Sequence, residues 1–296
     1  MRAARRFDHP LAIRVLPRTA LASALALVCA GALAAGGRAA AQDEVDLATA
    51  IATASPGEAN GHSFDRVVEL DPEVRYVGGA LVLEDVCIHG NGATLDLSSD
   101  YIEVLATGEP TRLDIDHCLI VNGIYGGSED YYGGGLFYGE QTQGWIAHNT
   151  FYNNSPCGLY LAEVYLAAGG VKVSSNIFFG NAPWGLIRNE EQPDVWLRYN
   201  NSFGHGGNNY GIHCACPSGE PEQILPGSDD LDPSNRVVDA QFVELPNPPK
   251  QPGDFHLRPE SPCIGTGEDN SDMGALPYVS TPAARSSWGA LKSLYR

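Results

Sequence analysis

Three stretches of the chain share one pattern, in which an asparagine and a short gap precede a phenylalanine and then small and polar residues: AHNTFYNNS from Ala147, SSNIFFGNA from Ser174 and RYNNSFGHG from Arg198. Aligning these anchors with an earlier corner gives steps of 31, 27 and 24 or 25 residues, from Cys118 to Asn149, Asn176 and Asn200 or Asn201. Repeats at periods of about 20–50 residues are typical of solenoids. We therefore interpret each stretch as one corner of a coil in a parallel β-solenoid.

The residues before each corner alternate as half-buried strands do. The apolar positions are Leu113 and Ile115, Ile146, Val171 and Val173, and Val195 and Leu197. Stacking such strands at about 4.8 Å per coil places like residues beside like, so corner asparagines can hydrogen-bond to one another and satisfy buried backbone groups. The phenylalanine two positions later would fill the interior. The alternative is a β-sandwich in which the echoes are accidental.

The chain divides into three segments by composition. Residues 1–41 have a basic leader, an apolar run from Ala20 to Ala35 and the A-x-A site Ala39-Ala40-Ala41, which predicts an export signal peptide. Residues 42–278 are expected to form the β-helix domain, with a short helix over 46–54 covering its open end. Residues 279–296 form a tail, in which 286–296 has the spacing of a short amphipathic helix. We expect a secreted, extracellular or cell-envelope protein, with the periplasm also open.

The charge balance excludes several partners. The net charge is −18, and removing a leader with six of the 18 Lys and Arg and one of the 36 Asp and Glu leaves 12 − 35 = −23. Such a surface repels nucleic acid and anionic membranes, so cations, neutral sugars or proteins are the expected partners. No apolar run after the leader reaches membrane-spanning length, so we expect no membrane insertion, and we expect a monomer.

Six cysteines follow the leader, at positions 87, 118, 157, 214, 216 and 263. An even number in an exported protein favours disulfides, although six thiols allow 15 pairings and the connectivity stays open. The segment His213-Cys214-Ala215-Cys216 could instead bind a metal, but no second Cys/His pair lies at zinc-like spacing. We predict disulfides and no metal site.

The asparagine corners, together with DFHLRPESPCIGTG (254–267) and DMGALPY (272–278), resemble the secreted bacterial right-handed parallel β-helix proteins of the pectate-lyase-like superfamily. The resemblance implies an all-β, right-handed parallel β-helix and often a polysaccharide substrate, but it also covers adhesins without catalysis. Cys263 departs from the usual small apolar residue and could staple the last coil to an earlier one. Gly204-His205-Gly206 is similar to one polygalacturonase signature, but the other signatures are missing, so that activity is not carried over.

Alternation also predicts which side chains leave the core. If Ile115, Ile146, Val173 and Leu197 point inward, one outward row holds Asp114, Trp145, Lys172 and Trp196, and a second holds Asp116, Ala147, Ser174 and Arg198. Indole faces with fixed polar groups suit sugar binding, so Trp145 and Trp196 are candidate substrate-binding residues. Tyr131 and Tyr132, in a glycine-rich loop beside this row, are two more. The alternative is that both tryptophans pack beneath inserted loops.

Two chemistries could use this face. In a lyase acting on a uronic acid, Lys172 would remove the proton alpha to the carboxylate while Arg198 holds that carboxylate. In a hydrolase, Asp114 and Asp116 would be the two carboxylates, about 6.6 Å apart along the strand. Acidic loop pairs, including Asp229-Asp230, could bind Ca²⁺ but lack regular ligand spacing, so any cofactor stays unknown.

These patterns predict a secreted carbohydrate-binding protein that acts on a polysaccharide or cell-surface glycan, as a lyase or a glycoside hydrolase. The alternative is a noncatalytic surface, adhesion or structural protein whose repeats only build a stiff rod. No Ser/His/Asp or Cys/His arrangement stands out in the sequence.

Overall fold

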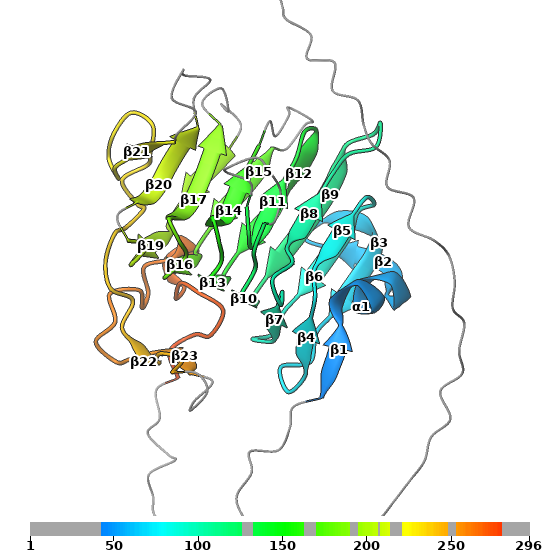
Figure 1. Ribbon diagram of the computed structural model, residues 1–296, viewed down its shortest axis with the longest axis horizontal. Helices are drawn as coiled ribbons and strands as arrows, with labels where there is room; N and C mark the ends of the chain where they lie inside the picture. Colours follow the sequence, from blue (N-terminus) through cyan, green and yellow to red (C-terminus); the bar gives the residue numbers. More distant parts are fainter. Residues whose placement is uncertain are drawn as a thin grey trace, which may run out of the picture. The chain divides into compact units, whose positions relative to one another are not determined.

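The computed structural model describes residues 43–125, 133–162, 170–189, 195–206, 208–213, 221–247 and 253–279. From residue 62 to residue 213 the described strands wind through three sheets in turn, so each complete coil contributes one strand to each sheet and neighbouring coils pair in parallel (Figure 1). The strands 55–59 and 222–224 at the two ends pair antiparallel with their neighbours. The predicted all-β parallel β-helix is confirmed.

The three main sheets have seven strands each. Sheet I contains β1 (Glu44–Asp46), β4 (Arg75–Val77), β7 (Thr94–Asp96), β10 (Leu119–Val121), β13 (Thr150–Tyr152), β16 (Ile177–Phe179) and β19 (Asn201–Phe203). Sheet II contains β5 (Ala80–Val82), β8 (Ile102–Val104), β11 (Leu136–Tyr138), β14 (Cys157–Leu161), β17 (Trp184–Asn189), β20 (Asn208–His213) and the antiparallel β21 (Glu222–Ile224). Sheet III contains β2 (Ser55–Ala59), β3 (His62–Glu69), β6 (Val86–His89), β9 (Thr111–Asp116), β12 (Thr142–Ala147), β15 (Val171–Ser174) and β18 (Val195–Arg198).

The register follows the predicted repeat. Ile115 pairs with Ile146 and Val173 with Leu197, and all four side chains lie in the core. Helix α1 (Leu47–Thr53) covers the first coil, as predicted: Asp46 caps it by accepting a hydrogen bond from Thr49 N at 2.7 Å, and Leu47 and Ile51 enter the core. An N-terminal helix therefore closes the apolar interior that the first coil would otherwise expose.

The corner between sheets III and I is held by a buried asparagine ladder. The Oδ1 atom of each asparagine accepts from the backbone N–H of the corner residue one coil earlier, at 2.9–3.1 Å, through Asn149, Asn176, Asn200 and Asn235. Each Nδ2 donates to a carbonyl of an earlier strand, for example Asn176 to Ile146 O at 2.8 Å. The ladder satisfies backbone groups that the turn would leave buried and unpaired. The predicted Asn149–Asn176 neighbourhood is confirmed, and Asn235 extends the ladder by a further coil.

A second ladder holds the corner between sheets I and II. Asn154 N and Asn181 N donate to Asn181 Oδ1 and His205 Nδ1, at 3.0 and 3.1 Å. His205 is therefore the last member of a structural ladder, and not an exposed residue of a sugar-binding signature. Its Nε2 lies 2.9 Å from Ser202 Oγ, which itself donates to Asn209 O, so Nε2 carries the proton and Nδ1 accepts.

The interior phenylalanines are confirmed in two of the three repeats. Phe151 and Phe178 are fully buried and stacked, with ring centroids 4.7 Å apart. In the third repeat the ladder uses Asn200, so Ser202 occupies the equivalent interior position. Phe203 points outward and stacks on Phe179. The Ser202 hydroxyl fits there because the His205 imidazole and Asn209 O satisfy it.

The segment after the coils packs on the outer face of sheet I. It contains the antiparallel pair β22 (Phe242–Glu244) and β23 (Asp254–Leu257) and the short 3-10 helix η1 (Glu268–Asn270). The apolar side chains that it contributes are buried against the outward residues of sheet I: Phe242, Phe255, Leu257, Met273 and Ala275. Hydrogen bonds from Gly274 N to Ser175 O and from Ala275 N to Thr150 Oγ1 fix it across the corner between sheets III and I.

The disulfide prediction is wrong for the four cysteines that the structure describes. Cys87, Cys118, Cys157 and Cys263 are free and buried, so Cys263 does not staple the final coil. Cys118, Cys157 and Cys263 fill apolar space as small hydrophobic residues would, whereas Cys87 is buried beside polar side chains of sheet III. Cys214 and Cys216 lie outside the described residues. Within the described ranges, no helix has the length and apolarity needed to cross a membrane.

Candidate functional site

The outer face of sheet III, formed by β6, β9, β12, β15 and β18, carries the candidate site. We call it the sheet III face. In-register pairing brings side chains from successive coils into rows, with Trp145 beside Lys172, Lys172 beside Trp196, and Ser174 beside Arg198. Trp145 and Lys172 lie on the same face of the molecule, as predicted.

Lys172 lies between the two tryptophans. Its Nζ atom is 5.3 Å from the centroid of the Trp145 ring and 4.7 Å from that of Trp196. The same Nζ atom forms an ion pair with Glu268 Oε1 at 2.8 Å. Two indole rings and a carboxylate therefore surround the ammonium group. The predicted lyase role needs an amine that faces the substrate, whereas the Lys172 amine already has these partners.

Arg198 continues the row in the same manner. Its guanidinium carbon lies 5.2 Å from the Trp196 ring centroid, and its Nε atom is 3.1 Å from Asp232 Oδ2. Asp232 is held by Ser234, and these hydrogen bonds lower the pKa of Asp232. Trp145, Lys172, Trp196 and Arg198 thus form one alternating aromatic and cationic column. The Lys172 and Arg198 side chains are 37% and 47% exposed, so the column presents charged groups to the outside.

Asp114 is on this face but is fully buried, which differs from its predicted exposure. Its carboxylate accepts from Trp145 N and Asn60 Nδ2, both at 2.9 Å, and from an Arg112 NH2 group at 3.3 Å. The Arg112 Nε atom is also 2.9 Å from Asp114 Oδ1, as an ion-pair contact without hydrogen-bond geometry. The tip of the β2–β3 hairpin covers it through Asn60. Asp114 therefore organises the start of β12, and its oxygens are already occupied.

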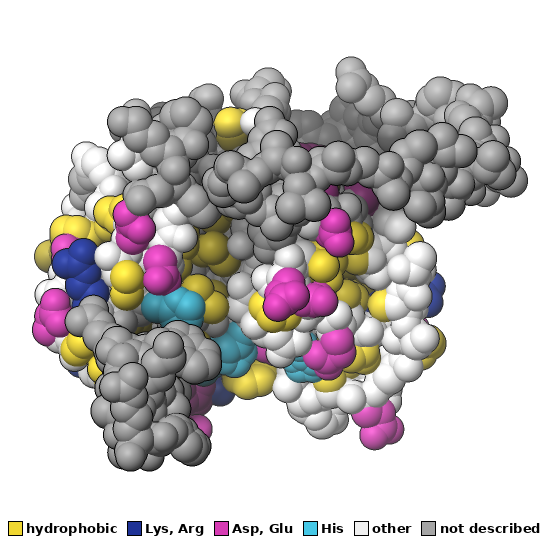
Figure 2. Space-filling view, turned by 90° about the horizontal axis from the view of Figure 1, so that it is seen from below, with side chains coloured by type: hydrophobic (Ala, Val, Ile, Leu, Met, Phe, Trp, Pro, Cys, Tyr) yellow, Lys and Arg dark blue, Asp and Glu magenta, His cyan; other side chains and the backbone are white. Residues whose placement is uncertain are grey.

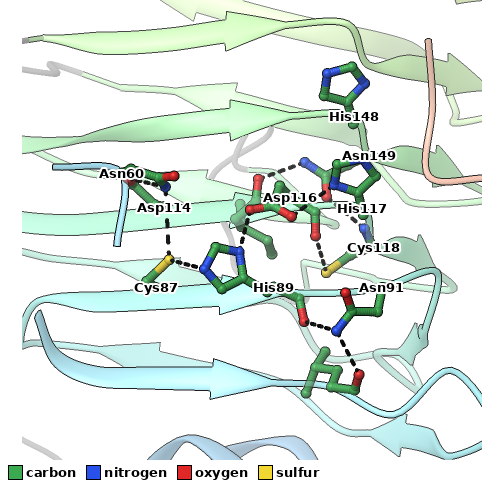
Figure 3. Close-up of polar contacts among 12 residues, drawn as sticks. Asn60, Cys87, His89, Asn91, Asp114, Asp116, His117, Cys118, His148 and Asn149 are labelled. Carbon is green, nitrogen blue, oxygen red and sulfur yellow. Dashed lines mark hydrogen bonds and ion pairs between the residues drawn. The ribbon is translucent and has the colours of Figure 1, made fainter. Parts of the chain in front are cut away.

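Asp116, by contrast, joins two histidines at the edge of this face (Figure 3). Its Oδ2 atom is 2.8 Å from His89 Nδ1, and its Oδ1 atom is 2.9 Å from His117 Nδ1. The side chains of His89, Asp116 and His117 are 24%, 14% and 44% exposed. His117 also stacks on His148, with centroids 4.9 Å apart. A carboxylate at Nδ1 fixes the proton there and leaves Nε2 as a lone-pair base.

His117 and His148 occupy equivalent positions in successive corners. Each precedes the ladder position and has a positive φ, 50° and 53°. The left-handed conformation turns these side chains away from the core at the point where sheet III ends. His148 Nδ1 donates to Asp272 O at 3.0 Å, and burial together with His117 lowers the pKa of His148. Of the two described histidines that pair with Asp116, His117 is the more exposed.

Cys87 extends the cluster along β6, where it lies beside Asp114 of β9. Its Sγ atom is 3.5 Å from His89 Nε2, so thiol, imidazole and carboxylate are connected in the order of a nucleophilic triad. The surroundings oppose that chemistry, however, because burial and the carboxylates of Asp114 and Asp116 raise the pKa of Cys87 to about 12. Reactive cysteines instead sit in electropositive, partly exposed sites. We regard Cys87 as a buried partner of His89.

Sequence reasoning missed His89, His117 and His148. The sequence does place His89 two residues after Cys87, and Asp116-His117 directly before an aligned corner. The link between His89 and Asp116, however, forms only when β6 and β9 pair.

Tyr131 and Tyr132 lie outside the described residues. Within the described ranges no cluster of His, Cys, Asp or Glu is arranged to hold a metal ion. On the face seen in Figure 2, histidine and acidic side chains lie close to one another.

Comparison with known proteins finds no match to any protein family, curated protein or solved structure.

Proposed function

We propose that the protein is a secreted, polysaccharide-acting β-helix protein of pectate-lyase-like type, whose glycan lies along the sheet III face. The proposal rests on two features that share this face. One is the aromatic and cationic column, and the other is the pair of histidines, His89 and His117, that contact Asp116. Extended sugar chains need repeated aromatic surfaces with fixed polar groups, and in-register coils repeat such groups at about 4.8 Å. The net charge of −18, or −23 without residues 1–41, favours neutral or sparsely charged glycans over dense polyanions.

In this proposal the roles differ from those that the sequence suggested. Lys172 and Arg198 bind glycan through their charged heads, which ion pairs with Glu268 and Asp232 hold on this face. His117 acts as the general base or acid, oriented by Asp116 at 2.9 Å. Its Nε2 atom has no partner within the described part of the chain. A base of this kind serves either proton abstraction in a lyase or activation of water in a hydrolase.

The experiment is a screen of the purified chain from residue 42 against uronate-containing and neutral polysaccharides. Absorbance of unsaturated products detects a lyase, and new reducing ends detect either class. We expect His117→Asn and Asp116→Asn to lower turnover about 10²-fold or more, with Lys172→Met mainly weakening binding. Turnover that survives both His117→Asn and Asp116→Asn would show that this pair is not the acid–base group.

A noncatalytic binding or adhesion protein is the second candidate. It is favoured by the internal pairing of Lys172, Arg198 and Asp114, since residues with fixed partners stabilise a surface without chemistry. Glycan binding without any turnover, lost in a Trp145→Ala, Trp196→Ala double variant, would support this candidate. Absence of both binding and turnover across the screen would contradict both.

A further inference from the structure

The segment that follows the coils reaches onto the sheet III face at one acidic residue. Glu268 begins η1 and lies 96 positions after Lys172, yet its Oε1 atom is 2.8 Å from Lys172 Nζ. The two side chains are 25% and 37% exposed, so solvent reaches the pair. The contact therefore joins the covering segment to the column at a point that an outside ligand can also reach.

The backbone holds Glu268 in place for this contact. Its N–H donates to Ser175 Oγ at 2.8 Å, and Gly267 N donates to Ser271 O at 2.8 Å. Met273 and Ala275, a few residues later, are buried against sheet I. The carboxylate is thus presented by an anchored loop, and it is not a freely moving surface side chain.

The electrostatic consequence concerns the whole column. Lys172 lies between both indole rings, so an anion bound there would be in contact with the centre of the column. With Glu268 ionised, the pair has no net charge, and the rest of the chain repels anions. Neutralising Glu268 would leave one uncompensated cation between the tryptophans.

We propose that Glu268 is an internal competitor that occupies Lys172 and so sets the preference of the sheet III face against anionic groups. This inference rests on the proposed glycan-binding function for its biological meaning. Its physical core, access of an anion to Lys172, does not need a glycan and can be tested separately. The residue is a specificity determinant and is not assigned any step of chemistry.

The first test uses iodide and acrylamide as quenchers of tryptophan fluorescence. In Glu268→Gln we expect iodide quenching to rise about two- to fivefold, the range that follows from an exposed ion pair, while quenching by neutral acrylamide stays unchanged. Asp269→Asn is the matched control, because Asp269 is the exposed neighbour and asparagine tolerates its φ of 56°. The double variant Glu268→Gln, Lys172→Met should lose the gain.

The second test titrates the same variants with a polyuronate and a neutral polysaccharide at low salt. Glu268→Gln should bind the polyuronate about two- to fivefold more tightly and the neutral glycan unchanged. Equal iodide quenching in wild type and Glu268→Gln, with an unchanged melting temperature, would overturn the inference. If quenching changes as expected but no variant binds any glycan, the inference about Glu268 stands and the proposed function fails.

Discussion

The outer faces of sheet I and sheet III are built on the same coils but differ in chemistry. Sheet I turns apolar side chains outward, and Tyr152, Phe179 and Phe203 stack along it. The described residues 240–247 and 253–276 bury this face with side chains such as Phe255 and Met273. Sheet III turns histidine, carboxylate, tryptophan and cations outward, and the same segment contacts it at Glu268 and Asp272. Coverage by this segment, and not strand geometry, therefore separates a second core from a candidate site.

Phe255 is the sharpest test of sheet I as a second core. The ring is 4% exposed and meets the edges of Tyr152 and Phe242, each at 5.2 Å between centroids. Phe255→Ala should lower the free energy of unfolding by about 3–5 kcal/mol, because it leaves a cavity between the segment and the sheet. Urea unfolding measures the change. His256→Ala removes a neighbouring side chain that is 39% exposed and pairs with Asp254, and it should cost less than about 1 kcal/mol. Equal losses in the two variants would contradict the second core.

The asparagine ladder holds the corner between sheets III and I. Removing one of its residues therefore tests whether both sheets depend on this corner for stability. Asn176→Ala would orphan Asn149 N and Ile146 O, which are both buried. We expect a loss of about 3 kcal/mol in urea unfolding, since a single orphaned group costs about 1–3 kcal/mol. Gln143→Ala, at an outward position of the adjacent strand, should change stability by less than about 0.5 kcal/mol. A loss below 1 kcal/mol for Asn176→Ala would show that water replaces the ladder.

Much of the fold could be predicted from the sequence because its cause is periodic. The corner asparagines recur at nearly fixed steps, and each must meet the next to satisfy a buried turn, so Asn149 and Asn176 imply the stacking. The capping helix followed from Leu47 and Ile51 in the same way. The sequence does not decide whether Asn200 or its neighbour Asn201 belongs to the ladder. The structure places Asn200 there, so the inward position two residues later is Ser202 and not Phe203.

The candidate site could be predicted only in part. The row of Trp145, Lys172 and Trp196 follows from alternation alone. The partners that set its chemistry do not, because Glu268 and Asp232 come from segments without repeats. Asp114 was expected to be exposed, but the turn of a distant hairpin brings Asn60 over it. Contacts of long sequence separation outside the repeat are not encoded in any local pattern.

His205 is buried in the interior, in contrast to the partly exposed His89 and His117 on the outer face of sheet III. Burial lowers the pKa of His205 from 6.5 to about 4. The folded state therefore disfavours the charged imidazole, so its contribution is present above about pH 6.5 and is lost as pH falls towards 4. The loss should approach about 3 kcal/mol, from 1.36 kcal/mol for each pH unit. Urea unfolding between pH 7.5 and 4 measures it.

Two variants isolate this effect. His205→Asn continues the pattern of Asn154 and Asn181, and we expect it to weaken the acid sensitivity while changing stability at pH 7.5 by about 1 kcal/mol or less. His62→Asn alters an exposed histidine and should keep the acid sensitivity of the wild type. If both variants retain the full loss on acidification, the acid sensitivity comes from groups other than the second ladder.

His117→Asn has the smallest expected effect on stability and completes the comparison from the side of sheet III. The side chain is 44% exposed, and asparagine accepts the φ of 50°, so the free energy of unfolding should change by less than about 0.5 kcal/mol. Turnover of the glycan found in the screen should nevertheless fall about 10²-fold, because the Asp116-oriented Nε2 base is lost. The contrary result would be a variant that is destabilised by 2 kcal/mol or more but whose folded fraction is fully active. It would show that the histidine pair stabilises the corner, so that both outer faces serve stability.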